Sequence, residues 1–224
     1  MVISITNRKG GTGKSTTAVN LSAELAANYG KTLLIDLDTQ GHAGLGVGIR
    51  HTKGLKTVHD IFKDPNVNLM DCIVKTQWED RYIAPADPLF GHNEAKDKGL
   101  LRDKLNEAIT KEGFEFVVID TSPSLDNLLL NALVASQYVL APFMPHYLSL
   151  EGIRGLARVF FRITALDNPS LRLLGLLPVM INQRVQQHRK VTQSLAAQFG
   201  LNRVFGGIRA DIRLVEAFES HQPV

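Results

Sequence analysis

The pattern with the clearest chemistry is NRKGGTGKST, which occupies residues 7–16. It ends as phosphate-binding loops end, because Gly13, Lys14 and Ser15 fill the last three places of G-x-x-x-x-G-K-[ST]. Glycines in such a loop let main-chain N–H groups approach a polyphosphate, the lysine reaches its terminal phosphates, and the hydroxyl ligates Mg²⁺. Position 8 holds arginine where the pattern asks for glycine, and Lys9 follows it. One phosphate-binding loop therefore carries two lysines, and the pattern explains only the second.

Acidic residues suited to a nucleotide site stand at the ends of two apolar runs. FEFVVID ends in Asp120, and TLLIDLDTQG carries Asp36 and Asp38 on alternate residues, which point to the same side of an extended chain. We predict that Mg²⁺ is held by Ser15, Asp36 and Asp120, partly through water, because open α/β sheets bind ligands at the carboxyl ends of their strands. From the residues alone, one of Asp36 and Asp38 could contact Mg²⁺-bound water and the other could orient the water that attacks the γ-phosphate of ATP; we assign Asp36 to the metal and Asp38 to the attacking water. The alternative for each carboxylate is a strand-end cap or a loop-turn residue.

Apolar runs of strand length alternate with helical patterns along the sequence. This order of elements determines where the candidate phosphate and metal residues lie in the fold. Continuous apolar runs predict buried strands at residues 2–6, 32–37, 114–120, 138–143 and 171–181. Helical patterns occupy residues 14–28, 99–111, 125–135, 150–166 and 191–199. The alternation predicts an α/β fold: a single domain over residues 1–224 with a mostly parallel twisted sheet and helices on both faces. The polar segment 75–98 is predicted to be a surface excursion rather than a domain boundary.

Composition narrows the class of protein. The chain of 224 residues is 44% hydrophobic and 21% charged, which is ordinary for a globular protein with a buried core. Its one cysteine, Cys72, cannot form an internal disulfide or a C-x-x-C metal site. Met1 is not followed by a signal sequence, and no apolar run reaches membrane length. We therefore expect a cytoplasmic protein.

Positive charge is concentrated in the last third of the chain. The formal net charge is +3, but residues 151–224 hold 10 Lys and Arg against 5 Asp and Glu, and 9 of those 10 are arginine. Arginine suits bidentate contacts with phosphate, so this part could face nucleic acid. The alternative is a set of solvated helix faces, because a surplus of this size is not extreme.

Several separated segments resemble the ParA/MinD family of ATPases, and the ParA branch is the closest fit. KGGTGKS at residues 9–15 resembles the deviant Walker A signature K-G-G-x-G-K-[ST] of that family. TLLIDLDTQGHAGLGVGI, VVIDTSPSLDNLLLNAL and HYLSLEGIRGL resemble further segments, with Thr39 and Ser122 where the family usually has proline. The resemblance implies a P-loop fold in which Lys9 reaches the nucleotide of a second subunit, so that two ATP molecules lie between the chains of a homodimer. This role accounts for the additional lysine.

The resemblance also implies roles for individual residues. The predicted catalytic residues are Lys9, Lys14 and Asp38, and the predicted nucleotide-binding residues are Lys9, Gly10, Gly11, Thr12, Gly13, Lys14, Ser15, Thr16 and Asn182. Asn182 lies in VMINQR, where the family contacts adenine, and an amide can pair with both the donor and the acceptor of that base. DNA-binding roles are implied for Arg184 in that stretch and for Arg209 and Arg213 in IRADIRLVEA. Ala210 stands where the family has a further arginine.

The function implied by the resemblance is an ATP-dependent dimerising switch that binds nucleoid DNA without sequence specificity. A ParB-like or other adaptor protein would stimulate ATP hydrolysis, and the cycle would position a cargo such as a plasmid, a chromosome origin or a carboxysome. Scattered arginines suit phosphate contact rather than base reading, and no helix-turn-helix segment precedes Met1, so operator binding is not expected. The family continues beyond SHQPV with a segment similar to P-R-S-x-G-A and a C-terminal helix, which we expect this sequence to lack.

Two other functional classes share this scaffold: membrane-associated positioning ATPases, and metabolic or metallocluster enzymes, which include cluster carriers and synthetases. A membrane-associated positioning ATPase similar to MinD needs a basic amphipathic C-terminal helix, and none is visible, so we expect no membrane partner. A metallocluster carrier needs at least a pair of cysteines, which Cys72 alone cannot supply. A synthetase on the same scaffold would need an additional substrate pocket that the sequence does not locate.

Overall fold

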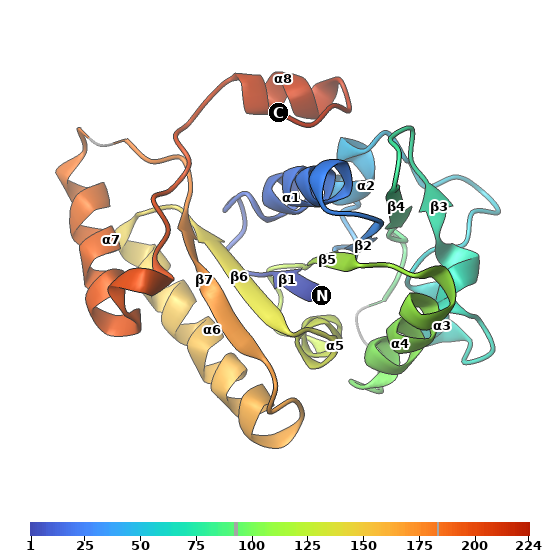
Figure 1. Cartoon of the computed structure of the whole chain (residues 1–224). Helices are drawn as coiled ribbons and strands as arrows, with labels where there is room; N and C mark the ends of the chain where they lie inside the picture. Colours follow the sequence, from blue (N-terminus) through green and yellow to red (C-terminus); the bar gives the residue numbers. More distant parts are fainter. Residues whose placement is uncertain (92–93, 183) are drawn as a thin grey trace.

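The computed structural model describes residues 1–91, 94–182 and 184–224. Its described strands form one seven-stranded sheet with the order β3-β4-β2-β5-β1-β6-β7 (Figure 1). The strands are β1 (Val2–Ile5), β2 (Thr32–Asp36), β3 (Val74–Lys75), β4 (Arg81–Ala84), β5 (Phe116–Asp120), β6 (Tyr138–Phe143) and β7 (Arg172–Pro178). β3 runs antiparallel to β4, and the other neighbouring pairs are parallel. The predicted mostly parallel sheet is confirmed, and each of the five predicted strands is present.

Helices connect the strands and cover both faces of the sheet. They are α1 (Lys14–Asn28), α2 (His42–Gly46), α3 (Asp60–Lys63), α4 (Leu100–Glu112), α5 (Asn127–Ala135), α6 (Tyr147–Leu166), α7 (Gln186–Phe199) and α8 (Arg213–Glu219), with 3₁₀ turns η1 (Leu69–Cys72) and η2 (Leu201–Arg203). Each predicted helix is present, but α6 begins at Tyr147 instead of residue 150, and α7 begins at Gln186 instead of residue 191. The short helices α2, α3 and α8 are absent from the sequence prediction. Within the described ranges, no helix has the length and apolar character that crossing a membrane requires.

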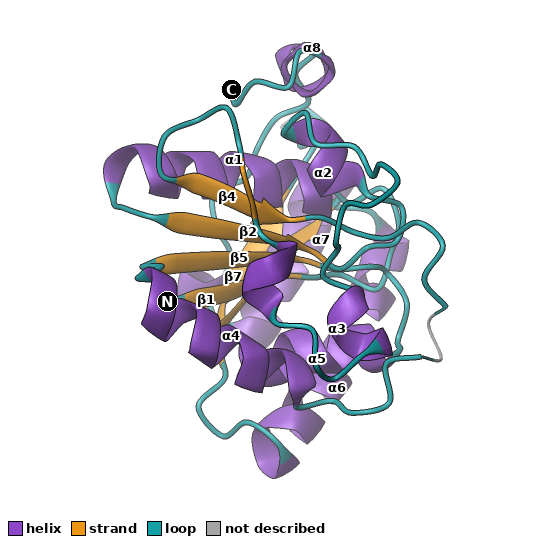
Figure 2. Ribbon diagram, turned by 90° about the vertical axis from the view of Figure 1, so that its right-hand side faces the viewer, coloured by secondary structure: helices purple, strands orange, loops and turns teal. Residues whose placement is uncertain are grey.

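The central strands are buried on both faces, which is why they read as continuous apolar runs. In β2, Leu33 and Ile35 pack in the core with residues of α4 and α5, whereas Leu34 packs in the core with residues of α1 and α2. Figures 1 and 2 show the corresponding layers: α1 and α2 lie on one side of the sheet, and α3, α4, α5 and α6 lie on the other. In both views α8 lies outside the layer formed by α1 and α2.

The strand order brings the carboxyl ends of β1, β2 and β5 together. β5 lies between β2 and β1, and Asp120 is the register partner of both Asp36 and Ile5. The loops that follow these three strands therefore leave the sheet at one edge, where open parallel sheets bind their ligands. The predicted phosphate and metal residues come from these loops, from the strand ends beside them and from the first turn of α1.

The segment 75–98 is not a surface excursion, and this prediction is wrong. It contains β4, which pairs with β2 inside the sheet. Arg81 is 1% exposed beneath α1, where its guanidinium donates hydrogen bonds to the Val19 carbonyl (2.5 Å) and the Ser22 hydroxyl (3.1 Å). The sequence concealed this strand because it is four residues long and begins with a charged side chain. Residues 92–93 of the segment lie outside the described residues.

Candidate functional site

The loop between β1 and α1 forms a cradle at the carboxyl edge of the sheet. Gly11 and Gly13 have φ angles of 69° and 73°, a left-handed backbone conformation that glycine adopts without strain. A Cβ atom on Gly10 or Gly11 would meet nothing within 4 Å, so the loop has room for a ligand against its backbone. α1 begins at Lys14 with no side-chain cap, which leaves the N–H groups of its first turn available to an anion in the cradle.

A cavity of about 390 Å³, here called the phosphate cavity, lies in this cradle. It is lined by Gly10, Gly11, Thr12, Gly13, Lys14, Ser15, Thr16, Asp38, Gln40, His42, Pro123 and Phe218. The structure thus brings the predicted loop residues together with Asp38. Sequence reasoning missed Gln40, His42, Pro123 and Phe218. Gln40 and His42 could have been inferred from their closeness to Asp38 in the sequence. Phe218 comes from α8, which contains none of the nucleotide-binding motifs, so the sequence did not indicate it.

Lys14 reaches into the phosphate cavity from the first residue of α1. It is 6% exposed, and its Nζ atom lies 3.4 Å from the main-chain oxygen of Lys9. Burial lowers the pKa of Lys14, whereas the charges of Asp120 and Asp38 raise it. The ammonium group therefore sits between the cradle and two carboxylates, where it can neutralise a bound polyphosphate.

Asp36 lies beneath the phosphate cavity rather than in its lining. It has no exposed surface, and its carboxylate accepts hydrogen bonds from the N–H groups of Asp38 (3.2 Å) and Gly44 (2.9 Å). Burial, followed by the charge of Asp120, raises the pKa of Asp36 well above its usual value. Asp36 thus fixes the loop after β2 and stands beside Asp120 in the sheet register.

Asp120 is fully buried at the end of β5, and neither of its carboxylate oxygens has a hydrogen-bond partner among the described residues. Burial raises its pKa to about 7, although the nearby Ser15 hydroxyl and Lys14 ammonium lower it. An unpaired buried carboxylate is costly, and a hydrated cation would satisfy it. These residues fit Mg²⁺ held by the Ser15 hydroxyl and, through water, by Asp120. No group of three His, Cys, Asp or Glu side chains in the described ranges could hold a metal alone, so phosphate oxygens and water would complete the shell.

The raised pKa values of Asp36 and Asp120 predict how the stability of the ligand-free protein depends on pH. The folded protein keeps protons that the unfolded chain releases above about pH 4, so the free energy of unfolding should fall as the pH rises toward 7. Burial lowers the pKa of His59 to about 4. Below about pH 6.5 the unfolded chain binds a proton at this histidine and the folded protein does not, so His59 makes the protein more stable as the pH rises to 6.5 and offsets part of the loss caused by the two carboxyl groups. We expect a loss of about 1 kcal/mol between pH 6.5 and pH 8 in urea denaturation, because Asp120 titrates in this range and His59 no longer contributes.

The control for this experiment is Asp120→Asn, which removes one of the two titrating carboxyl groups. Its free energy of unfolding should change less steeply over the same pH range. Wild-type and Asp120→Asn proteins whose free energies of unfolding change equally from pH 6.5 to pH 8 would contradict the assignment, because the other group that titrates there, the Met1 α-amino group with its lowered pKa, is common to both.

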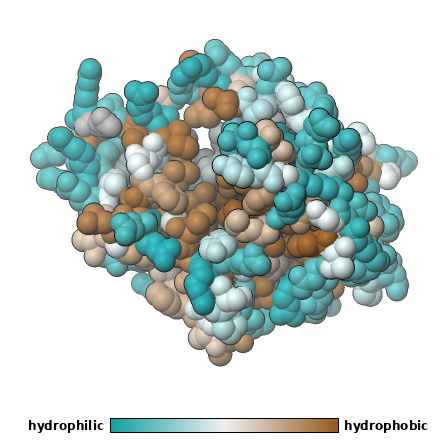
Figure 3. Space-filling view, in the orientation of Figure 1, coloured by the Kyte–Doolittle hydropathy of each residue, from teal (hydrophilic) through white to brown (hydrophobic). Residues whose placement is uncertain are grey.

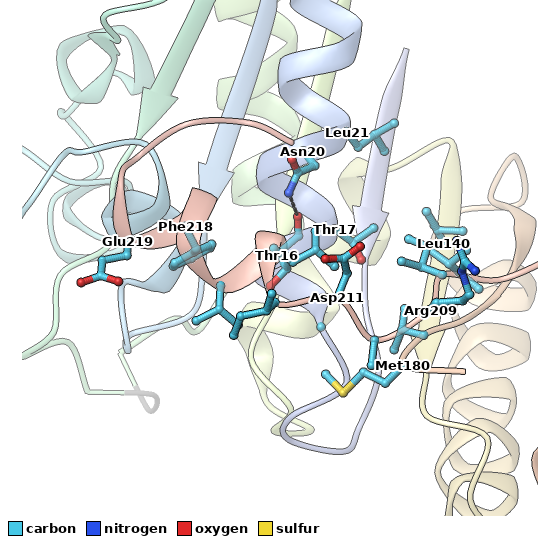
Figure 4. A pocket seen from close by; sticks show the side chains of 18 residues that line it. Thr16, Thr17, Asn20, Leu21, Leu140, Met180, Arg209, Asp211, Phe218 and Glu219 are labelled. Carbon is cyan, nitrogen blue, oxygen red and sulfur yellow. Dashed lines mark hydrogen bonds between the residues drawn. The ribbon is translucent and has the colours of Figure 1, made fainter. Parts of the chain in front are cut away.

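A second cavity of about 1040 Å³, here called the apolar cavity, adjoins the first and shares Gly13, Thr16 and Phe218 with it. Its walls come from α1, from the end of β7 and from the segment that contains α8. In Figure 4 the α1 side chains of Thr16 and Asn20 lie across from Arg209, while Phe218 lies at the far end. The lining is mainly aliphatic and includes Leu177, Val179, Met180, Ile208, Ile212 and Val215.

The residues predicted to bind adenine and DNA are less closely gathered. Asn182 is exposed and lines neither cavity, and its side-chain oxygen accepts a hydrogen bond from the Arg184 N–H (3.0 Å). Arg184 is also exposed, and Arg209 lines the apolar cavity. Arg213 forms an ion pair with Asp211 (2.7 Å) on the exposed side of α8. The structure therefore leaves their roles as predictions.

Lys9 lies outside the lining of the phosphate cavity. Its N–H donates to the Asn7 side chain (3.1 Å), and its carbonyl accepts from the Thr12 hydroxyl (3.2 Å), so the loop backbone around it is fixed. Gly152 of α6 stands beside it, since an added Cβ there would lie 4.0 Å from the Lys9 Cβ. Within the described residues, the Lys9 ammonium group has no hydrogen bond or ion pair. It is thus able to reach a group outside its own cavity.

Comparisons with known proteins connect the chain to a family. A family model described as "AAA domain" (AAA_31) matches residues 1–173. The chain is 37% identical over 215 residues to the chromosome-partitioning ATPase Soj of Thermus thermophilus, and the match covers 96% of this chain and 83% of that protein.

Two solved structures are similar over almost the whole chain. A plasmid partition protein of Borrelia burgdorferi bound to AMPPNP is 28% identical with a TM-score of 0.83, covering 99% of this chain and 90% of that one. Cobyrinic acid a,c-diamide synthase of Mycobacterium smegmatis, with a bound ATP analogue and magnesium, is 28% identical with a TM-score of 0.80, covering 98% and 91%.

Proposed function

Because the chain belongs to the ParA/Soj family of partition ATPases, we propose that it is an ATP- and Mg²⁺-dependent dimerising switch that positions a cargo on DNA. The observation that carries the proposal is the phosphate cavity, where Lys14 and Asp38 line a glycine-rich cradle above the unpaired carboxylate of Asp120. The similar proteins bound to AMPPNP, or to an ATP analogue with magnesium, support the choice of nucleotide and metal. In this proposal residues 1–224 act as a single ATPase domain.

The residues of the cradle bind the triphosphate. N–H groups from Gly10 to Thr16 hold the β- and γ-phosphates, and Lys14 neutralises their charge. The Ser15 hydroxyl would hold Mg²⁺ directly, and Asp36 and Asp120 would hold it through water. When bound, Mg²⁺ supplies positive charge to the phosphate oxygens. Burial raises the pKa of Asp120, and a cation held beside it would favour its ionised form.

Asp38 orients the attacking water from the wall of the phosphate cavity. Its Oδ1 atom accepts a hydrogen bond from the Gln40 N–H (3.1 Å), and its own N–H donates to Asp36 (3.2 Å), so both ends of the residue are fixed. In the described part of the chain, no arginine lines this cavity. Hydrolysis is therefore slow until Lys9 of a second subunit and an adaptor protein, ParB-like or of another kind, complete the site.

The apolar cavity takes the nucleoside. It adjoins the cradle through Gly13 and Thr16, and its mainly aliphatic lining suits a purine ring and ribose. Asn182 lies on the turn between β7 and α7, outside this cavity. For its amide to contact adenine, Asn182 must exchange its present hydrogen bond with the Arg184 N–H for hydrogen bonds to the base.

The protein binds DNA through exposed arginines when it is loaded with ATP, and it is associated with the nucleoid in the cytoplasm. Arg184 and Arg209 are exposed and form no ion pair in the described structure, whereas Arg213 must leave Asp211 to contact a phosphate. Such contacts recognise the backbone and not the base sequence. The cargo is a plasmid, a chromosome origin or a protein body.

DNA binding tests the proposal and yields a prediction for Arg184. With ATP and Mg²⁺, the wild-type protein should bind a random-sequence duplex, and the affinity should fall steeply as KCl rises from 50 to 200 mM. Arg184→Glu should weaken binding about tenfold on every sequence and reduce the slope against salt, because one phosphate contact is replaced by repulsion. Fluorescence anisotropy measures both effects.

The control for DNA binding is Lys111→Glu, which alters an exposed lysine of α4 that is paired with Glu107. This variant should bind DNA as the wild type does. An ATP-loaded dimer that ignores DNA at low salt would refute the proposal. ATP-dependent sedimentation with anionic lipid vesicles would favour a membrane-associated positioning ATPase instead, and ATP turnover without binding to either would favour a synthase similar to the M. smegmatis enzyme.

A further inference from the structure

The C-terminal segment from residue 205 to residue 224, here called the arm, crosses above α1. It leaves the sheet beside the end of β7, and its helix α8 lies over α1 and reaches α2 (Figures 1 and 2). No residue of α8 is buried, and Ile212 and Val215 are 66% and 61% exposed. Figure 3 shows apolar surface around a hollow beneath the arm. The arm is therefore less tightly packed than the sheet and its covering helices.

Phe218 anchors the arm to the body of the protein. Its ring packs against the core formed by α1 and α2. A Cβ atom on Gly46 would lie 2.7 Å from this ring, so only glycine at that position admits it. A hydrogen bond from the Val224 N–H to the Asn20 side chain (2.8 Å) ties the end of the arm to α1. Main-chain hydrogen bonds join the first residues of the arm to the end of β7, from the Phe205 N–H to the Leu176 carbonyl (3.0 Å) and from the Ile208 N–H to the Pro178 carbonyl (2.8 Å). Beyond this base, Phe218 and the last residues hold the arm to the body of the protein.

Phe218 also connects the two cavities, because it lines both. On its other side it contacts α2, which begins four residues after Asp38. α2 and the Asp38 loop are held together through Asp36, which accepts hydrogen bonds from the N–H groups of Asp38 and Gly44. The ring of Phe218 therefore links the nucleoside end of the site to the loop that carries Asp38.

We propose that the arm closes over the bound nucleoside and that Phe218 then positions the Asp38 loop for hydrolysis. This inference rests on the nucleotide binding proposed above. The apolar cavity, at about 1040 Å³, is at the upper limit of ligand pockets, roughly 300–1,000 Å³, so the arm has room to move inward. Ile208 is fixed to the end of β7 by main-chain hydrogen bonds, whereas Ile212 and Val215 lie in the exposed part of the arm. A nucleoside gives Ile212 and Val215 an apolar surface to cover, so occupancy favours the closed arm. Nucleotide exchange requires an open arm, and hydrolysis requires a closed one.

A disulfide between the far end of the arm and the body of the protein tests the need for opening. A Cβ atom on Gly48 would lie 3.5 Å from the Cβ of His221, within the range of about 3.5–4.5 Å that disulfides span. The double variant Gly48→Cys/His221→Cys should therefore cross-link the arm when oxidised. Cys72 does not compete, because it is buried and burial raises its pKa to about 12. Both engineered positions have positive φ angles, and the reduced form of the same protein is the control for that strain.

The measurement is the release of N-methylanthraniloyl-ADP, loaded before oxidation and chased with excess ADP. Release should be at least tenfold slower from the oxidised protein than from the reduced protein, and each single-cysteine variant should be insensitive to the oxidant. Equal release rates from a protein shown to be cross-linked would overturn the proposal while leaving nucleotide binding intact. Failure of the wild-type protein to bind the labelled nucleotide would instead refute the proposed function and, with it, this inference.

The positioning role of Phe218 has its own test. Phe218→Ala should release labelled ADP about tenfold faster and lower the rate of ATP hydrolysis at saturating ATP, while its affinity for inorganic tripolyphosphate stays unchanged. Phe218→Leu should restore part of both losses. Glu216→Ala, on the same helix but in the lining of neither cavity, should behave as the wild type does. A Phe218→Ala protein whose turnover at saturating ATP equals that of the wild type, or which loses affinity for tripolyphosphate, would show that the ring does not act through the nucleoside and the Asp38 loop.

Discussion

Replacing Lys14 with alanine should lower the affinity for ATP by about 100-fold or more while leaving the chain folded. Lys14 is 6% exposed, and its ammonium group faces the carboxylates of Asp120 and Asp38 from the first residue of α1. Without it, the triphosphate would enter a cavity whose nearest charged side chains are acidic, and repulsion there is weakly screened because the site is buried. Titration with N-methylanthraniloyl-ATP measures the affinity, and circular dichroism checks the fold.

Lys111→Ala is the matched control, because it removes a lysine that is exposed and paired only with Glu107. Its affinity for ATP should equal that of the wild type. If Lys14→Ala binds ATP within a factor of about three of the wild type, the cavity between β1 and α1 is not where the triphosphate binds. The result would also remove the basis for placing the nucleoside in the neighbouring apolar cavity.

The phosphate cradle and the carboxylates at the strand ends beside it could be predicted from the sequence, because both follow from local rules. A glycine-rich turn between a strand and a helix fixes the position of Lys14 and Ser15 without any long-range information. Asp36 and Asp120 end two parallel strands, and parallel strands end at a common edge, so their closeness follows from the strand order. The alternate positions of Asp36 and Asp38 were also informative, although only Asp38 lines the phosphate cavity.

The contribution of α8 to the site and the strand β4 beside β2 could not be predicted, because both depend on contacts between distant parts of the chain. Phe218 reaches the phosphate cavity from α8, and nothing in its neighbouring residues marks it as part of a ligand site. Arg81 is buried only because Val19 and Ser22, about 60 residues earlier, offer it oxygen atoms under α1. Hydrophobic patterns treat a charged residue as exposed, so they conceal a strand that begins with one.

Asp38→Ala should produce a protein that binds ATP and remains a dimer. Its rate of ATP hydrolysis should be lower than that of the wild type by a factor of about 100 or more. The carboxylate of Asp38 is replaced by a methyl group that cannot orient water, whereas the cradle and Lys14 are unchanged. Since ATP is not consumed, the ATP-bound dimer should accumulate. Size-exclusion chromatography with light scattering in ATP and Mg²⁺ measures the dimer, and phosphate release measures the turnover.

Lys9→Ala is the informative counterpart, because its side chain lies outside the cavity of its own subunit. It should bind ATP with nearly the wild-type affinity but stay monomeric, since the charge that a second subunit donates to the γ-phosphate is absent. Asp38→Ala should therefore bind ATP and dimerise without hydrolysis, whereas Lys9→Ala should bind ATP without dimerising. A monomeric Asp38→Ala protein in ATP would contradict the role given to Asp38. A Lys9→Ala protein that dimerises as the wild type does would show that its ammonium group is a solvated surface charge, and the assembly step would then need another contact that senses the γ-phosphate.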